Sequence, residues 1–206
     1  VNTYNKQTTS GARQTGGFQS FINSNDTCVF KGAFTAPSTP NAGTSVITVA
    51  SGAAKAALAL TDIDSVMQKI YENGGSATRI MVSPKLRRDF SDLMVNDTGV
   101  RRNIDEDGKL RQSVDVYMSD FGDLMVVPNY IMGLAHTTTD ATTTQFDAAD
   151  SAALIYDPQW FAMATLRPMQ EVEVGQKGDS TVGMFVEEWS LEVKNPKGCG
   201  AVYGLA

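Results

Sequence analysis

The stretch from residue 61 to residue 94 constrains the fold most, because it holds two helices and a strand with almost no residues between them. The first helix is predicted to begin at Thr61 as N-cap, with Asp64 as its capping-box partner. Gly74 and Gly75 end it, since glycine takes positive φ freely at a helix C-terminus. Apolar side chains at helical spacing predict one buried stripe, formed by Ile63, Val66, Met67, Ile70 and Tyr71.

A short strand and a second helix follow directly. RIMVSP, residues 79–84, predicts an apolar strand followed by a helix that Ser83 caps and Pro84 opens, where a missing N–H costs nothing. The buried face of this second helix is expected to consist of Leu86, Phe90, Leu93 and Met94. The middle of the chain therefore predicts an αβα unit.

Strands dominate the rest of the chain. VDVY (114–117) and LMVV (124–127) are predicted to pair through the turn SDFGD, whose Asp and Gly suit a reversal. Three further strands are expected, at residues 45–49, 151–156 and 161–168.

The last forty residues are predicted to be all-β. Between Thr181 and Val193 the apolar residues change from even to odd positions, which predicts a bulge near Glu187–Glu188 or a change of packing environment. Asn195–Gly198 is a predicted turn, after which residues 201–205 are expected to pair back as a hairpin.

Three polar stretches are predicted to lie outside the core. Residues 1–20 are rich in Thr, Gln, Ser and Gly and suit an arm lying on another surface, with Phe18, Phe21 and Ile22 at its far end. Residues 95–112 carry both signs of charge and predict an exposed loop, and residues 137–147 are a Thr-rich surface excursion.

Composition excludes several classes of protein. The chain has 206 residues, a net charge of -6 and no apolar run long enough to span a membrane. This acidity argues against wholesale nucleic-acid binding and leaves room only for a locally basic patch. Cys28 and Cys199 lie far apart with no metal-ligand spacing, so both are expected to be free thiols.

No motif in the sequence carries catalysis. His136 is the one histidine and has no identifiable nucleophile or orienting acid. Asn103–Gly108 matches the first half of an EF-hand loop, but Val114 stands where a bidentate Glu is required. Gly175–Ser180 has the composition of a phosphate loop without its spacing, and Glu187–Glu188 point to opposite faces of a strand. We therefore name no catalytic, cofactor-binding or metal-binding residue, and no cofactor.

Five short motifs occur in one order along the chain: Glu72–Gly75, Tyr117–Gly122, Leu166–Pro168, Lys177–Ser180 and Glu188–Asn195. Together with the upstream Arg13-Gln-Thr-Gly-Gly-Phe, this series resembles the C-terminal two-thirds of a major capsid protein of tailed bacteriophages. Each motif alone is ordinary turn chemistry, whereas their shared order over nearly the whole chain is specific.

The resemblance implies an α+β fold of the Hong Kong 97 capsid type, with an axial α/β domain and a peripheral domain with long strands. The expected division is an arm, connecting segment and peripheral strand at 1–54, an axial-type domain at 55–165, and C-terminal strands at 166–206. The family also carries an N-terminal arm, an extended loop and a spine helix, which are absent from this sequence. Two interpretations stay open: the coding sequence upstream of Val1 encodes these parts, or the shell contacts that they make are supplied elsewhere.

The resemblance further implies a structural function rather than an enzymatic one. The expected protein self-assembles into hexamers and pentamers of an icosahedral phage head around double-stranded DNA, which contacts the inner face non-specifically. It is expected to assemble in the host cytoplasm, to reside in the virion and to have no membrane partner. Scaffolding, portal and cement proteins are possible partners. Two alternatives stay open: another virion protein of the tail or decoration type, and a hydrolase using a Ser or Asp with His136.

Overall fold

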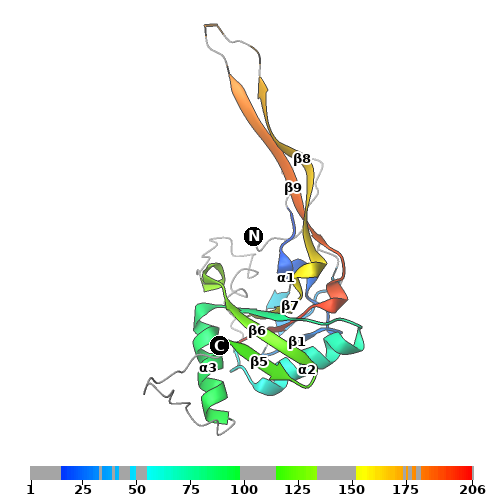
Figure 1. Cartoon of the computed structure of the whole chain (residues 1–206), viewed down its shortest axis with the longest axis vertical. Helices are drawn as coiled ribbons and strands as arrows, with labels where there is room; N and C mark the ends of the chain where they lie inside the picture. Colours follow the sequence, from blue (N-terminus) through cyan, green and yellow to red (C-terminus); the bar gives the residue numbers. More distant parts are fainter. Residues whose placement is uncertain are drawn as a thin grey trace.

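The computed structural model describes residues 15–32, 34–38, 40–41, 47–49, 55–97, 115–133, 152–173, 175, 178–179 and 182–205. Figure 1 shows two parts: an α/β body built on a six-stranded sheet, and a long two-stranded ribbon that projects from one end of the body. The expected α+β class is confirmed.

The predicted αβα unit is confirmed. It consists of helix α2 (Leu60–Glu72), strand β4 (Arg79–Val82) and helix α3 (Pro84–Asp97). Gly74 has φ +76°, and the N–H groups of Gly74 and Gly75 donate to the carbonyls of Tyr71 and Ile70, which completes a Schellman C-cap. At the start of α3 the Ser83 hydroxyl accepts from the Leu86 N–H at 3.3 Å, as a capping residue should.

The expected N-cap of α2 is wrong. The helix begins at Leu60, and Ala59 occupies the cap position. The Asp62 carboxylate accepts from the Ala59 N–H at 2.9 Å and from Lys31 Nζ at 2.5 Å. Asp64 instead accepts from the Tyr117 hydroxyl at 2.7 Å. An acid at the third helical position with a cationic partner outweighs the preference for threonine at the cap.

The apolar stripe of α2 is confirmed for Ile63, Val66, Met67 and Ile70, which are all buried. Tyr71 is an exception, because 63% of its surface is exposed and its ring lies against that of Phe121 at 5.7 Å. On α3, the Leu86 and Phe90 side chains are fully buried, Leu93 is partly buried, and the Met94 side chain lies outside the described atoms.

The sheet has the strand order β1-β10-β7-β4-β6-β5. β4 is parallel to β6 and β1 is parallel to β10, while the other neighbours are antiparallel. The remaining strand bounds are β1 Cys28–Phe30, β5 Val116–Ser119, β6 Gly122–Pro128, β7 Ala152–Tyr156 and β10 Gly200–Tyr203. The predicted hairpin of β5 and β6 is confirmed, with Asp120 and Phe121 in its turn.

The expected C-terminal hairpin is wrong. β10 does not pair with the strand before it but inserts between β1 and β7, where all its residues are buried. A Cβ on Gly200 would lie 2.3 Å from the Thr27 carbonyl oxygen, so only glycine fits this position. A strand of Gly, Ala, Val and Tyr buried on both faces suits the middle of a sheet better than a solvated hairpin.

Each face of the sheet is covered. α2 and α3 pack on one face around Ile80, Leu124, Ile155 and Val202. The other face is covered by N-terminal segments that include helix α1 (Phe18–Phe21), Ile22 and strand β2 (Phe34–Thr35), which pairs with β3 (Thr48–Val49). Of the strand predicted at 45–49, only residues 47–49 are described.

The ribbon consists of β8 (Phe161–Glu173) and β9 (Gly183–Val193). β8 extends five residues beyond the strand predicted at 161–168, and β9 lies within the stretch predicted at 181–193. Among the described residues, the two strands pair only with each other. The register of the two strands is irregular near Glu187–Glu188, as predicted, but the extra residues are on β8 and not on β9. Thr165 pairs with Trp189 and Arg167 with Glu188, so Leu166 has no partner, and a second extra residue lies between Arg167 and Gln170.

Candidate assembly surface

The described residues contain no arrangement suited to catalysis or metal binding. His136 and Asn103–Gly108 lie outside them, while Gly178 and Asp179 form a turn with Gly178 at φ +74°. No three His, Cys, Asp or Glu side chains in the described ranges are grouped so that they could hold a metal ion. Within the same ranges, no helix is long and apolar enough to cross a membrane.

Both cysteines are free and buried, as expected. Burial raises the pKa of the Cys28 thiol to about 12 and that of the Cys199 thiol to about 11. Both thiols are therefore neutral at physiological pH and are poor nucleophiles. They serve as small apolar groups in the core.

The ribbon carries the most conspicuous surface chemistry. Leu166 is 74% exposed, and Met163 and Phe185 are each 68% exposed. Further large apolar side chains on the two strands are at least one-third exposed: Met169, Val172, Met184 and Trp189. Because solvent-exposed apolar side chains in this density mark interaction surfaces, the ribbon is the candidate site.

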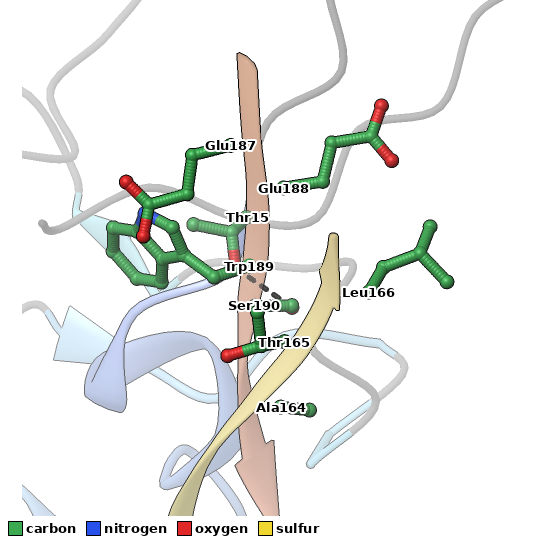
Figure 2. Close-up of a pocket in the computed structure, with 8 residues that line it drawn as sticks. All are labelled: Thr15, Ala164, Thr165, Leu166, Glu187, Glu188, Trp189 and Ser190. Atoms are coloured by element: carbon green, nitrogen blue, oxygen red, sulfur yellow. Dashed lines mark hydrogen bonds between the residues drawn. The ribbon is translucent and has the colours of Figure 1, made fainter. Parts of the chain in front are cut away.

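A groove lies along the ribbon. It has a volume of about 610 Å³ and is lined by Thr15, Ala164, Thr165, Leu166, Glu187, Glu188, Trp189 and Ser190. Figure 2 shows Glu187 and Trp189 on one side of β9 and Glu188 on the other, as alternation along a strand requires. The predicted separation of the two acids is therefore confirmed.

Three polar contacts flank the groove. The Thr15 and Ser190 hydroxyls lie 2.9 Å apart, and the Leu191 N–H donates to the Thr15 hydroxyl at 3.4 Å (Figure 2 draws the first). Arg167 donates to the Glu188 carboxylate at 2.8 Å across the two strands. This ion pair is exposed, so it contributes at most about 1 kcal/mol to stability.

The ribbon joins the body at two matched turns, which we call the root. β7 leads into the 3₁₀ helix η2 (Pro158–Trp160), and β9 leads into η3 (Pro196–Gly198). In each turn an acid or amide side chain precedes proline and caps the turn: Asp157 accepts from the Gln159 N–H, and Asn195 accepts from the Gly198 N–H. The turn predicted at Asn195–Gly198 is confirmed, and the turn after Asp157 has the same kind of side-chain cap.

Aromatic rings tie the root to the N-terminal segment. The rings of Phe18 and Phe161 are 4.4 Å apart, and Tyr156 lies edge-on to both, at 5.7 and 5.9 Å. The prediction named Phe18, Phe21 and Ile22 as the residues that pin the end of the polar N-terminal stretch. It is confirmed for Phe18, which packs in this aromatic group, and for Ile22, which is fully buried, whereas Phe21 is half-buried. The ribbon therefore leaves the body from a packed base.

Sequence reasoning placed the two strands but missed the extent of the exposed apolar surface. The sequences of the two strands did contain a signal. Apolar and acidic residues are mixed there without the alternation that a strand with one buried face shows. β8 and β9 carry five Glu and one Arg, interspersed with Met, Leu, Phe and Trp. A second, smaller exposed apolar group lies on the β5–β6 hairpin and comprises Val116, Met118 and Met125.

The described residues thus form an α+β body with an exposed apolar ribbon directed away from its core (Figure 1). The comparison with protein families identifies the kind of structure. A family model described as SU10 major capsid protein matches residues 1–206. The chain therefore belongs to this family: it is a major capsid protein, a structural component of the virion capsid and not an enzyme.

One solved structure is similar to the chain at a low level. The crystal structure of a virus-like particle from Pyrococcus furiosus aligns with 14% identity and a TM-score of 0.31. The alignment covers 74% of this chain and 55% of that chain, so the chain spans about half of the other's length. No curated protein is similar enough to count as a match.

Proposed function

We propose that this chain assembles into the hexamers and pentamers of an icosahedral phage head that encloses double-stranded DNA. Membership of a major capsid protein family supports self-assembly as such. The exposed apolar ribbon is the observation that carries the finer proposal, because nothing in the described part of the chain covers it.

The energetics of the ribbon favour an assembled state. An isolated two-stranded ribbon is only marginally stable in water and needs packing on at least one face. Complete burial of a Leu, Phe or Met side chain contributes about 1.5–3 kcal/mol, so Met163, Leu166 and Phe185, each about two-thirds exposed or more, leave several kcal/mol available for association. Contacts with neighbouring subunits supply that packing.

The arrangement we propose is of the Hong Kong 97 type. In this proposal the axial-type domain, expected at 55–165, is the α/β body with its αβα unit, while residues 161–165 belong to the ribbon strand β8. Segments 1–54 and 166–206 add β1 and β10 to the same sheet, and the ribbon is the peripheral part. In this arrangement the bodies surround the capsomer axis and the ribbons reach between subunits.

Contact with DNA is proposed for a locally basic face only, because the net charge is -6. Lys85 and Arg88 are exposed on α3 and suit that role, whereas the acidic ribbon does not. Scaffolding, portal and cement proteins are further partners in this proposal. Assembly takes place in the host cytoplasm.

Sedimentation velocity and negative-stain electron microscopy of the purified protein test this proposal over a range of protein and salt concentrations. We expect capsomers or closed shells above a threshold concentration. Protein that remains monomeric under every condition would refute it. In native particles, the chain should be the dominant coat band; a copy number far below that would favour the tail or decoration alternative.

A further inference from the structure

The sequence contains one Asn-Gly pair, Asn73–Gly74, and this pair lies at the C-terminus of helix α2. Asparagine before glycine is prone to deamidation, because glycine has no Cβ to hinder attack by its backbone nitrogen on the asparagine side chain. The space around Gly74 is open, since a Cβ there would meet no atom within 4 Å. The pair is therefore a candidate site of modification that needs no enzyme.

The reaction has two steps. The Gly74 nitrogen, which loses its proton to solvent, bonds to Cγ of Asn73 and the Cγ–Nδ2 bond breaks, so that ammonia leaves and a cyclic imide forms. Water then opens the imide at either of its carbonyl carbons, which gives aspartate or isoaspartate. The net change consumes water and releases ammonia, with no oxidation or reduction.

The folded backbone holds this pair in a conformation that cannot close the ring. Asn73 has φ −85° and ψ 6°, so the Gly74 nitrogen nearly eclipses the Asn73 nitrogen and lies away from the side chain. The Gly74 N–H donates to the Tyr71 carbonyl, and the Gly75 N–H donates to the Ile70 carbonyl, both at 2.9 Å. Cyclisation requires rotation about ψ of Asn73, which breaks the first of these bonds and opens the C-cap of α2.

The Asn73 side chain is held as well. Its Nδ2 donates to the Lys69 carbonyl at 2.8 Å and to the Asp26 carbonyl at 3.5 Å. Lys69 Nζ donates to the same loop, to the carbonyls of Asn25 at 3.0 Å and Cys28 at 2.8 Å. The end of α2 therefore holds the loop that leads into β1, and Asn73 contributes through donors that deamidation removes.

Deamidation would replace these contacts with repulsion. A carboxylate has no N–H to donate, so it would face the Lys69 and Asp26 carbonyl oxygens at the negative end of the helix dipole. It would also compete with the loop for the Lys69 ammonium, which lies one helical turn earlier. Isoaspartate adds a carbon to the backbone and so shifts Gly75, which packs so closely on Gly198 that a Cβ there would lie 2.7 Å from the Gly198 Cα.

We propose that Asn73 is a site of spontaneous deamidation controlled by the C-cap of α2. Asn73 reacts only when the cap opens, and the product releases the loop at residues 24–28 from the helix. The inference concerns the folded subunit and does not depend on its assembly.

Wild-type protein alone tests the control by the cap. The deamidated fraction of the peptide that contains Asn73 is followed by mass spectrometry in folded protein and in protein unfolded in urea at the same pH. The folded protein should react at least tenfold more slowly. Because one opening exposes the Gly74 amide to both reactions, the ratio of the two rates should match the hydrogen-exchange protection factor of that amide within about fivefold. Equal rates, or a larger disagreement with the protection factor, would overturn the inference.

Two matched substitutions test the contribution of the loop. Lys69→Met keeps an unbranched, helix-forming side chain but removes both bonds from Nζ, so folded protein should deamidate at least threefold faster. Lys85→Met is the control, because Lys85 is an exposed residue of α3, and it should leave the rate unchanged. All three proteins should react at one rate in urea. Equal rates for folded Lys69→Met and folded wild type would contradict control by these contacts.

The effect of the product is tested with Asn73→Asp, and Asn73→Ala is the control that removes the donors without adding charge. Asn73→Asp should have the lower thermal midpoint of the two, by about 2–4 °C. The Thr27 and Cys28 amides, which donate to the Ser24 carbonyl within the loop, should exchange at least threefold faster in Asn73→Asp than in wild type. Wild-type exchange at both amides would overturn the release of the loop.

Discussion

Truncation of Leu166 tests whether the ribbon is buried by association. Leu166 has no pairing partner on β9 and is 74% exposed in the free subunit, so it contributes little to folding. If a neighbour covers it, Leu166→Ala removes about 1–2 kcal/mol of association free energy per site. This range is three-quarters of the free energy gained by burying a whole leucine side chain, minus the part that the remaining alanine methyl group still contributes. Each 1.4 kcal/mol is a factor of ten in an equilibrium constant, so the assembly threshold should rise by about 5- to 30-fold.

The assay is the concentration at which light scattering departs from the monomer baseline, with shells confirmed by electron microscopy. Leu166→Met is the matched control, because it keeps the apolar volume and should shift the threshold by less than about threefold. The thermal midpoint of the free subunit should be the same for all three proteins. An unchanged threshold for Leu166→Ala would show that Leu166 stays exposed in the assembled state and would refute the reasoning.

Three further predictions concern the body. Gly200→Ala should lower the free energy of unfolding by about 3 kcal/mol in urea, because a Cβ there overlaps backbone, whereas Gly175→Ala, with open space around it, should change it by less than about 0.5 kcal/mol. Asp62→Ala should cost about 1–2 kcal/mol in the same assay, since it removes the acceptor at the start of α2; a loss no larger than that of the exposed Asp123→Ala would contradict this role. Burial raises the pKa of Cys28 to about 12, above its unfolded value near 9, so the folded state binds the extra proton between these values. The contribution of Cys28 to stability should be fully present below pH 9 and fall by about 1.4 kcal/mol per pH unit from pH 9 toward 12, and the buried Cys199 thiol, with its pKa raised to about 11, adds a slope of its own from pH 9. A Cys28→Ala variant whose stability falls as steeply as that of the wild type would contradict the assignment.

The parts of the fold that sequence predicted depend on neighbours in the chain. The stripe on α2, the glycine pair after it and the Ser83-Pro84 start of α3 each involve interactions within a few residues. Local propensity and periodicity determine such features, and these predictions are confirmed. The cap of α2 was misplaced because Lys31, which is distant in sequence, stabilises Asp62 in the first turn.

The parts that sequence did not predict depend on pairing over long separations. β10 lies between β1 and β7, and no local pattern in Gly200–Tyr203 indicates which strands flank it. The assembly surface was missed for a related reason. Met163, Leu166 and Phe185 look like core residues in a sequence, and only the isolation of the ribbon shows that they face solvent.

The paired turns at the root have a mechanical consequence. Each contains a proline, which fixes one backbone torsion, and each is held by a side-chain cap, so the two strands cannot easily pivot one at a time. β9 alone, at about 3.3 Å per residue, gives the ribbon a reach of about 35 Å. At this length, a rotation of the ribbon by about 5° at the two turns moves its far end by about 3 Å, which is close to the rise of one strand residue. In a shell of the proposed kind, a small difference in curvature between subunit environments would therefore displace the tip of the ribbon by about the length of one strand residue.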